Sequence, residues 1–365
     1  MPQTSLTDSV KHGCRVLRYL VAETSACAWR FLKNAVKALI GRPPYFDERG
    51  LFLRQYVLHL TGLRPLRAIT FRSHTPGEGA GAHALMNMNT MAFARTADLI
   101  YQHTPFKVIH HGGERPMHEW VAAWEGFFNL GEGEAVCDRG RREVVSYLYN
   151  IVGLELWFGG PGRREELARG FGALIPEFRG KYYRNSLPRT TREVTVAVNI
   201  RRGDVSDNRL SYRFTTTEKI LRTVSDVKSI LDGRGVPYRI DIYSNGKSDE
   251  FEDFSALGAA VHLNPGVDVF WTMRELIEAD ILITAKRSNF SLYAGLISDG
   301  IKIFEPRTND DPAILSRPLA YPGTLWLYIC RPADWVSCGR DGSLDRAGFE
   351  GRLDILQQAK AAAGA

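Results

Sequence analysis

The sequence contains no run of about eighteen apolar residues, the length that a membrane-spanning helix requires. Its five cysteines are scattered along the chain and form no Cys-x-x-Cys pair. An odd number of widely spaced cysteines argues against a disulfide framework and a zinc site, and it indicates a reducing compartment. Internal repeats are absent, and the only biased tract is an alanine-rich C-terminus. These absences predict a globular cytoplasmic protein without a metal centre.

A strong excess of one charge is also missing, because 47 basic and 41 acidic residues give a net charge of +6. So mild an excess fits an anionic small ligand and does not require nucleic acid. No RNA-recognition motif, zinc-finger spacing or helix-turn-helix pattern is present, so we expect no nucleic-acid partner. The length of 365 residues exceeds that of one ordinary core, which predicts two domains.

A basic segment, residues 1–42, precedes the first expected domain. From residue 11 to residue 42, apolar and basic side chains are interleaved in a way typical of one or two amphipathic helices. The charges interrupt any signal-peptide core. Such helices either pack on their own domain or lie on an anionic membrane surface. The second interpretation predicts peripheral contact at the inner face of the membrane.

The first expected domain, residues 43–190, opens with a βαβ pattern. A strand over residues 67–73 precedes a glycine-dense loop and a helix over residues 85–98, and a second strand follows at 99–102. The loop is neither a Gly-x-Gly-x-x-Gly fingerprint nor a Walker loop, which argues against a nicotinamide or P-loop site. Its glycines either let a substrate approach the backbone or simply make a tight turn.

Aromatic and histidine residues are concentrated between positions 110 and 129. The histidines match no common zinc spacing, so no metal site is expected there. Trp120 and Trp124 lie four residues apart, which places them on one helix face. That face lies either in a core or exposed for stacking on sugars. A further helix is expected over residues 141–157.

The second expected domain, residues 191–335, alternates strands with helices, and residues 336–365 form a C-terminal helix and tail. This alternation predicts a parallel sheet covered by helices, so the expected fold class is α/β. The expected strands are 194–200, 238–243, 261–264, 280–284 and 301–304, and the expected helices are 217–233, 269–279 and 290–297.

The first of these strands ends in the hexapeptide Asn-Ile-Arg-Arg-Gly-Asp at positions 199–204. Because alternate side chains of a strand share a face, Asn199 and Arg201 should leave on one side and Arg202 on the other. Ligands of open α/β sheets bind beyond the carboxyl ends of the strands. A planar guanidinium there suits phosphate oxygens. The alternative is a solvated strand end with a surface Asp–Arg pair.

Two further strands end in polar, turn-forming residues. The second strand is followed by Ser244 and Asn245, and the fourth by a helix that begins near Ser288 and Asn289. Ser288 is a good N-cap, and the free amides of that helix start would receive a diphosphate. Since parallel strands end at the same edge of a sheet, three strand ends are expected to converge on one anion-binding edge.

This region resembles a known group of enzymes. The hexapeptide at 199–204 looks like the His-x-Arg-Arg-x-Asp motif of the α1,2/α1,6-fucosyltransferase and protein O-fucosyltransferase superfamily, which includes bacterial nodulation fucosyltransferases. Residues 271–291 look like that family's helix, strand and Ser-Ser-Phe-Ser stretch. The resemblance implies a GT-B fold, in which two Rossmann-like domains with parallel sheets face each other across a cleft. It also implies an inverting transfer of fucose from GDP-fucose to a glycan acceptor, without a metal or a cofactor.

The resemblance further implies roles for individual residues. Arg201 matches the arginine that contacts the β-phosphate of GDP-fucose, and Asn199 stands where the family usually has His. The implied donor-binding residues are Asn199, Arg201, Arg202, Ser244, Asn245, Ser288, Asn289 and Phe290. The implied acceptor-side residues, in the place of a glycine-rich family motif, are Gly79, Gly81 and His83.

The predicted catalytic residues are Arg201, Asp204 and Asp207. Arg201 would stabilise the charge that builds on the departing GDP, and either aspartate would accept the proton of the acceptor hydroxyl. The alternative for each aspartate is a carboxylate that caps the loop.

Two other functions stay open. A GT-B transferase that uses another nucleotide sugar is one, because the amide of Asn199 forms hydrogen bonds but does not titrate. A nucleotide- or glycan-binding module without turnover is the other. A cell-surface polysaccharide, a lipid-linked oligosaccharide and a protein all fit as the acceptor.

Overall fold

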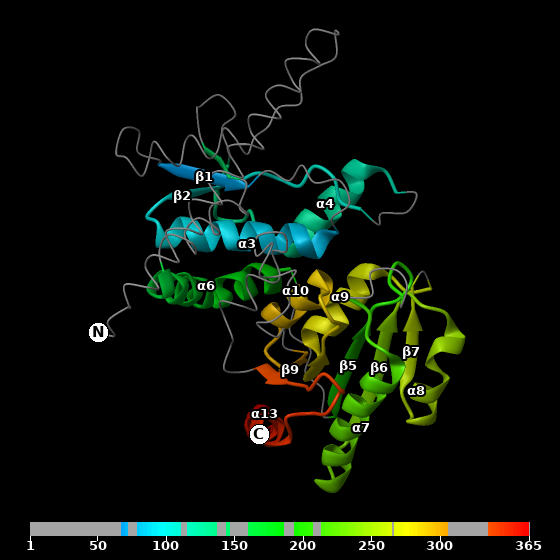
Figure 1. Cartoon of the computed structure of the whole chain (residues 1–365). Helices are drawn as coiled ribbons and strands as arrows, with labels where there is room; N and C mark the ends of the chain where they lie inside the picture. Colours follow the sequence, from blue (N-terminus) through cyan, green and yellow to red (C-terminus); the bar gives the residue numbers. More distant parts are fainter. Residues whose placement is uncertain are drawn as a thin grey trace, which may run out of the picture. The chain divides into compact units, whose positions relative to one another are not determined.

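The computed structural model describes residues 67–71, 79–110, 115–136, 144–146, 160–185, 193–206, 213–264, 266–305 and 335–364. The basic segment at residues 11–42 lies outside them, as does Asp207. The chain divides into two compact units, one with a four-stranded and one with a six-stranded sheet. Figure 1 colours both along the sequence. Among the described residues, no helix is both long and apolar enough to cross a membrane.

The first unit contains a parallel sheet in the order β3-β2-β1-β4. Its strands are β1 (Ala68–Phe71), β2 (Ile100–His103), β3 (Ala135–Val136) and β4 (Val144–Ser146). Helix α3 (Ala80–Thr96) connects β1 to β2, so the predicted βαβ opening is confirmed.

The predicted helix over residues 141–157 is wrong at its start, where β4 lies. Val144 and Val145 pair with Ile69 and Thr70 of β1. Valine has a restricted side-chain torsion that suits a strand better than a helix. Pairing with a neighbouring strand therefore overrides the local pattern at this position.

The second unit contains a parallel sheet in the order β10-β9-β8-β5-β6-β7. Its strands are β5 (Val194–Ile200), β6 (Tyr238–Ser244), β7 (Ala260–Leu263), β8 (Ile281–Ile283), β9 (Ile301–Phe304) and β10 (Trp335–Ser337). The chain starts at β5, winds outward to β7 and then crosses back to β8 on the other side of β5. A topological switch point therefore lies between β5 and β8, where open α/β sheets bind their ligands.

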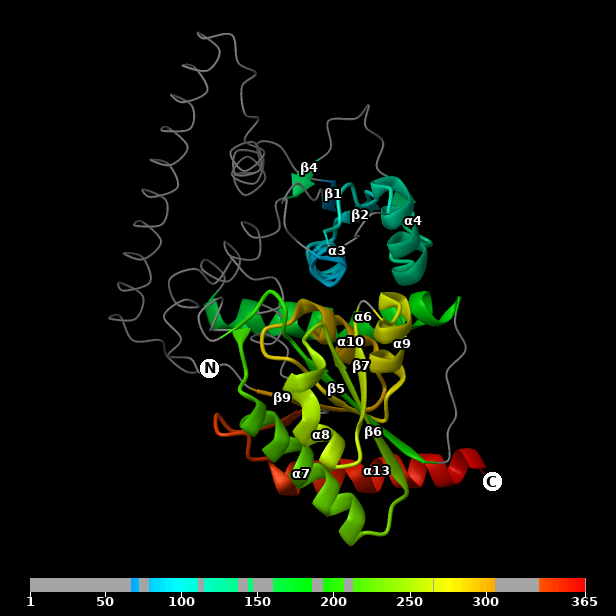
Figure 2. The same cartoon turned by 90° about the vertical axis from the view of Figure 1, so that its right-hand side faces the viewer.

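Helices cover both faces of this sheet (Figures 1 and 2). Helices α7 (Thr217–Gly233) and α13 (Arg346–Gly364) lie on one face, and α9 (Val269–Glu278) and α10 (Asn289–Ile297) on the other. A 3₁₀ turn, η2 (Ser248–Phe251), and α8 (Glu252–Ala256) lie between β6 and β7 in the sequence. The α/β class is thus confirmed, with two Rossmann-like parallel sheets.

The helix pattern explains how α7 joins the core. Ile220, Val224, Val227 and Leu231 recur with helical spacing, are buried and pack in one cluster with β5 and β6. Helix α9 begins where the Asp268 carboxylate accepts hydrogen bonds from two backbone amides of the first turn, 2.9 and 3.0 Å long. Both helices follow from the sequence alone because face and start are marked locally.

The aromatic residues of α4 (Met117–Phe128) belong to the interior of the second unit. Trp120 and Trp124 are 4% and 1% exposed, and both rings contact Phe270 of α9. The core interpretation of this pair is confirmed, since buried rings have no face free for a sugar. Within the part of the chain that the structure describes, no group of three His, Cys, Asp or Glu side chains is placed to hold a metal ion.

Helix α10 is anchored at its C-terminal end by α6 (Gly160–Tyr183). The guanidinium of Arg179 donates hydrogen bonds to the carbonyl oxygens of Ile297 and Ser298, at 2.9 and 2.6 Å. A cation at a helix C-terminus also stabilises the helix dipole. The opposite end of α10 lies at the carboxyl edge of the sheet.

Candidate functional site

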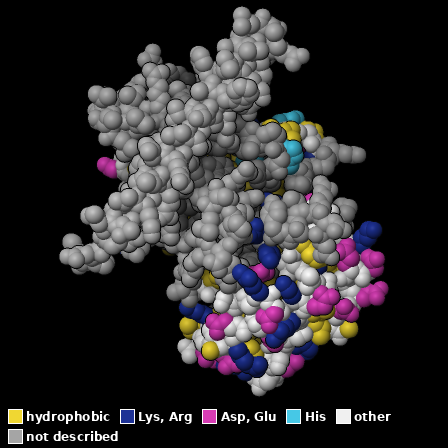
Figure 3. All heavy atoms as spheres, in the orientation of Figure 1, with side chains coloured by type: hydrophobic (Ala, Val, Ile, Leu, Met, Phe, Trp, Pro, Cys, Tyr) yellow, Lys and Arg dark blue, Asp and Glu magenta, His cyan; other side chains and the backbone are white. Residues whose placement is uncertain are grey.

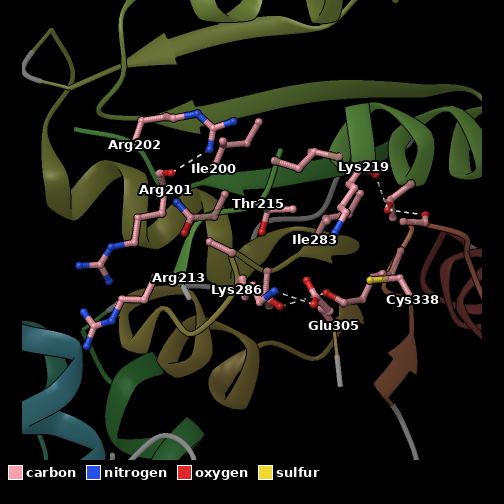
Figure 4. A pocket seen from close by; sticks show the side chains of 18 residues that line it. Ile200, Arg201, Arg202, Arg213, Thr215, Lys219, Ile283, Lys286, Glu305 and Cys338 are labelled. Atoms are coloured by element: carbon pink, nitrogen blue, oxygen red, sulfur yellow. Dashed lines mark hydrogen bonds and ion pairs between the residues drawn. The ribbon is translucent and has the colours of Figure 1, made fainter. Parts of the chain in front are cut away.

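A pocket lies at the topological switch point of the six-stranded sheet (Figure 4). It takes in about 550 Å³, including space open to solvent. Its walls come from the residues that follow β5, β8 and β9, from the first two turns of α7, and from the loop after β10. These segments lie far apart in the sequence, and the doubly wound topology brings them together at one edge of the sheet.

Cationic side chains predominate in the pocket. Of the described residues that line it, five carry a positive charge, against a single carboxylate, Glu305: Arg201, Arg202, Arg213, Lys219 and Lys286. The surface of this unit is not basic throughout, since Figure 3 shows acidic side chains along the right-hand edge of the visible face. A concave, positively charged site at the end of a parallel sheet favours an anionic ligand.

Arg201 leaves the end of β5 and forms a two-point ion pair with Asp204. Its Nε lies 3.3 Å from Oδ1 and its Nη2 2.6 Å from Oδ2. The two side chains are 22% and 33% exposed, so an incoming anion has access to the guanidinium. Gly203 makes the tight turn between them with a φ of +77°, which a residue with a side chain rarely adopts. Asp204 therefore holds Arg201 in place.

Arg202 turns away from Arg201, as the strand alternation predicts (Figure 4). Its guanidinium donates to the Arg201 carbonyl oxygen at 3.0 Å and to Oγ1 of Thr217 at 3.2 Å. It also lies 3.3 Å from a Glu250 oxygen and 4.5 Å above the Phe214 ring. With 3% of the residue exposed, Arg202 ties the strand end to the start of α7.

The polar residues at the end of β6 support this loop. The Asn245 side-chain oxygen accepts a hydrogen bond from the Arg202 amide at 3.2 Å, and Oγ of Ser244 accepts one from the Gly246 amide at 3.2 Å. Asn199 lines the pocket and donates through Nδ2 to the Tyr243 carbonyl oxygen at 3.4 Å. Neither Ser244 nor Asn245 is among the pocket's lining residues, whereas Asn199 is.

Ser288 is the N-cap of α10, which confirms that prediction. Its Oγ accepts a hydrogen bond from the Ser291 amide at 3.4 Å. The preceding Arg287 has a φ of +54°, an uncommon conformation for a residue with a side chain. A second, smaller depression at this helix start includes Ser288 and Asn289, and it shares Lys286 and Glu305 with the first pocket. The helix start and Arg201 therefore border adjoining parts of one edge.

The glycine-rich segment packs against the start of α10. An ideal Cβ on Gly81 would lie 2.7 Å from the Asn289 carbonyl oxygen and 2.9 Å from Cα of Phe290. His83 is completely buried, and its ring centroid lies 5.7 Å from that of Phe106. The structure thus places Gly81 in backbone contact with two of the predicted donor-binding residues.

The close contact at Gly81 leads to a stability prediction. Gly81→Ala should destabilise the protein by about 1 to 3 kcal/mol, because the new methyl group meets immobile backbone and forces α3 or α10 to shift. Chemical denaturation measures the loss.

Gly126→Ala in α4 is the matched control, since nothing lies within 4 Å of its ideal Cβ. There alanine should be neutral or stabilise the helix by roughly 0.5 to 1 kcal/mol. Equal changes in the free energy of unfolding for the two variants would contradict the close packing of Gly81 against Asn289 and Phe290.

The polar residues of the pocket that the sequence reasoning missed include Arg213, Thr215, Lys219 and Glu305. A local signal existed for one of them. Glu305 directly follows the strand that ends at Phe304, so the strand-end rule applied a fourth time would have found it. The other three lie before or within the first turns of α7 and join the site only through the fold.

Cys338 is also among the residues that line the pocket. Burial, reinforced by the nearby Glu305 carboxylate, raises the pKa of the Cys338 thiol to about 12. Since the thiolate is the nucleophile, alkylation of Cys338 at pH 8 should be on the order of 1000-fold slower in the folded than in the unfolded protein. Iodoacetamide labelling followed by peptide mass spectrometry measures both rates, and equal rates would refute the prediction.

No protein-family model matches the chain, and no curated protein sequence matches it significantly. Among solved structures, it is similar to a mutant of FUT1 from Arabidopsis thaliana in complex with GDP, with 11% identity, 73% of this chain and 81% of that chain covered, and a TM-score of 0.36. Fucosyltransferase NodZ from Bradyrhizobium is 12% identical over 64% of this chain and 94% of its own, with a TM-score of 0.34.

A third similar structure is the heptosyltransferase WaaC of E. coli with ADP, at 11% identity and a TM-score of 0.36, covering 80% of this chain and 99% of that one. All three likenesses are distant. The α/β class of this chain is established by its own two parallel sheets.

Proposed function

We propose that this chain is an inverting, metal-independent glycosyltransferase that moves fucose from GDP-fucose to a glycan acceptor. The observation that carries the proposal is the cationic pocket at the switch point of the second unit, which adjoins the N-terminus of α10. A nucleoside diphosphate sugar matches this site because its diphosphate is anionic. Its nucleoside and its sugar, on either side of the diphosphate, would fill the two adjoining depressions. The motif resemblance at 199–204 supports fucose as the sugar.

The diphosphate is proposed to bind between Arg201 and the start of α10. Arg201 offers a planar fork of donors suited to two phosphate oxygens. The first amides of α10 have no partner within the helix and carry the positive end of its dipole. Ser288 caps this turn through its side chain and so leaves the helix start ordered for an anion.

In the proposed reaction, an oxygen of the acceptor attacks the anomeric carbon of fucose while the bond to the β-phosphate oxygen breaks. The electron pair of that bond departs with GDP, and Arg201 and the helix start stabilise the charge that develops there. The hydroxyl proton passes to a carboxylate. Asp204 is suited to this, because Arg201 would exchange its carboxylate for phosphate when the donor binds. Asp207 is the second candidate base.

A sibling transferase with another nucleotide sugar is the second candidate function. The specific observation behind it is Asn199, which lines the pocket where the similar family has His. Its amide contacts the Tyr243 carbonyl at 3.4 Å and presents both a donor and an acceptor to a ligand. Such a group fits the edges of several bases.

A binding screen tests the proposal. Thermal unfolding is recorded with GDP, UDP, ADP and CMP at equal concentrations, since a ligand that binds only the folded state raises Tm, and a tighter ligand raises it more. Release of GDP from GDP-fucose is then followed with and without glycan acceptors. Stabilisation by GDP with turnover supports the fucosyltransferase, and stabilisation by UDP or ADP supports the sibling. Binding of GDP without turnover would indicate a binding module, and no binding would refute the proposal.

A further inference from the structure

Glu305 is the feature of the pocket that diphosphate binding does not explain. It follows the last residue of β9 and is the only acidic residue among the described residues that line the pocket. A carboxylate repels phosphate and weakens an anion site. Because Glu305 stands among five cationic lining residues, we expect it to face a part of the ligand that is neutral and donates hydrogen bonds.

The position of Glu305 is fixed by the neighbouring strand. Both the amide and Oγ1 of Thr284, directly after β8, donate to the Ile303 carbonyl oxygen, at 2.9 and 3.1 Å. The ends of β8 and β9 are thereby tied together. Glu305 is thus attached to rigid backbone, which a residue that discriminates between ligands requires.

Among the described residues, only one carboxylate oxygen of Glu305 has a partner. Oε1 lies 2.8 Å from Nζ of Lys286, and the two side chains are 15% and 27% exposed. No hydrogen bond to Oε2 is formed by the residues that the structure describes. The pair lies toward the centre of the pocket in Figure 4. Carboxylate oxygens accept hydrogen bonds from hydroxyl groups.

With the diphosphate bound as proposed, between Arg201 and α10, the sheet order puts Glu305 on the side of the diphosphate away from β6. Neighbouring strands lie about 4.8 Å apart, so the end of β9 is roughly 10 Å from the end of β5. In doubly wound sheets, a dinucleotide lies across the switch point, with its nucleoside over the second strand of the chain. That strand is β6 in this unit, which leaves the opposite side, over β8 and β9, for the sugar.

We infer that Glu305, held by Lys286, binds hydroxyl groups of the donor sugar and determines which sugar is transferred. The inference rests on the proposed function. Two adjacent hydroxyls donate to the carboxylate, and Lys286 donates to a ring or hydroxyl oxygen. Ile283 and Ile303 also line the pocket, and their apolar side chains form no hydrogen bonds. Glu305 and Lys286 would therefore distinguish donor sugars by the arrangement of their hydroxyl groups.

Glu305→Gln tests the inference because glutamine has the same shape without the charge. For the variant, kcat/KM for GDP release from GDP-fucose should fall about 10- to 100-fold, the effect of losing charged hydrogen bonds. The preference for GDP-fucose over GDP-mannose should shrink by a similar factor. The Kd of GDP, measured by calorimetry, should change less than about twofold, since GDP lacks the transferred sugar that Glu305 is inferred to contact.

Glu350→Gln is the matched control. Glu350 belongs to α13 and pairs with Arg346 and Arg234, 3.1 and 3.7 Å away, outside the pocket lining. This variant should retain both the rate and the sugar preference of the unaltered protein.

The outcomes separate the inference from the function on which it rests. If the unaltered protein releases GDP but Glu305→Gln keeps its sugar preference, the inference alone fails. It also fails if the variant loses GDP affinity in parallel with turnover, because Glu305 would then act on the nucleotide. If the unaltered protein neither binds GDP nor turns over any donor, the proposed function fails and the inference with it.

Discussion

Arg201→Ala is expected to lower kcat/KM for transfer by roughly 100- to 1000-fold, the usual effect of removing a group that stabilises a developing anion. Its free energy of unfolding should stay within about 1 kcal/mol, because an ion pair open to solvent contributes little. The guanidinium is 22% exposed and its partner Asp204 is 33% exposed. Transfer assays and chemical denaturation of the same preparation give both quantities.

Arg201→Lys should fail almost as completely. An ammonium keeps the charge but cannot form the planar, two-point contact with phosphate oxygens. Arg222→Ala is the matched control, since Arg222 is also on the surface in an ion pair, 2.7 Å from Asp341, and is not among the residues that line the pocket. Wild-type turnover in Arg201→Ala would remove the basis of the proposed mechanism.

The elements that the sequence predicts well are those whose signals are local. Strand β5 has the bounds expected from its alternating valines, and α7 ends at Gly233 as predicted. The Ser288 cap follows from one side chain and the amide of Ser291. Such features need only neighbours within a turn or a strand, so propensity and spacing suffice to place them.

Features that depend on distant partners were beyond this reasoning. Strand β4 forms because its backbone pairs with the free side of β1. Arg213 and Lys219 line the pocket only because α7 starts beside the ends of β8 and β9. Gly81 touches Asn289 across more than two hundred positions of sequence, and no spacing rule links them. Tertiary packing settles these positions.

Arg201 and Arg202 also show which features are local and which depend on tertiary contacts. The sequence correctly separates the directions of their side chains, since neighbours in a strand alternate. It does not show what each meets. Arg201 meets a carboxylate on the surface, whereas Arg202 is enclosed by Thr217, Glu250 and Phe214. Replacing the two arginines should therefore have different effects on the free energy of unfolding.

Arg202→Ala is accordingly expected to destabilise the protein by about 2 to 3 kcal/mol, in contrast to Arg201→Ala. The substitution removes a buried guanidinium, leaves the Thr217 hydroxyl and the Arg201 carbonyl without their partner, and opens a cavity. The loss is smaller than for a fully buried ion pair, because Glu250 is 37% exposed and water can solvate it. Urea denaturation monitored by circular dichroism measures the difference.

Arg202→Met separates packing from charge, since methionine fills most of the same volume and lacks the donors. It should recover about 1 kcal/mol of the loss. Activity should fall in both variants to the extent that the loop carrying Arg201 loosens, because Arg202 holds the Arg201 carbonyl at 3.0 Å. An Arg202→Ala protein that is as stable as the unaltered one yet inactive would show instead that Arg202 contacts the donor directly, as the motif resemblance implies.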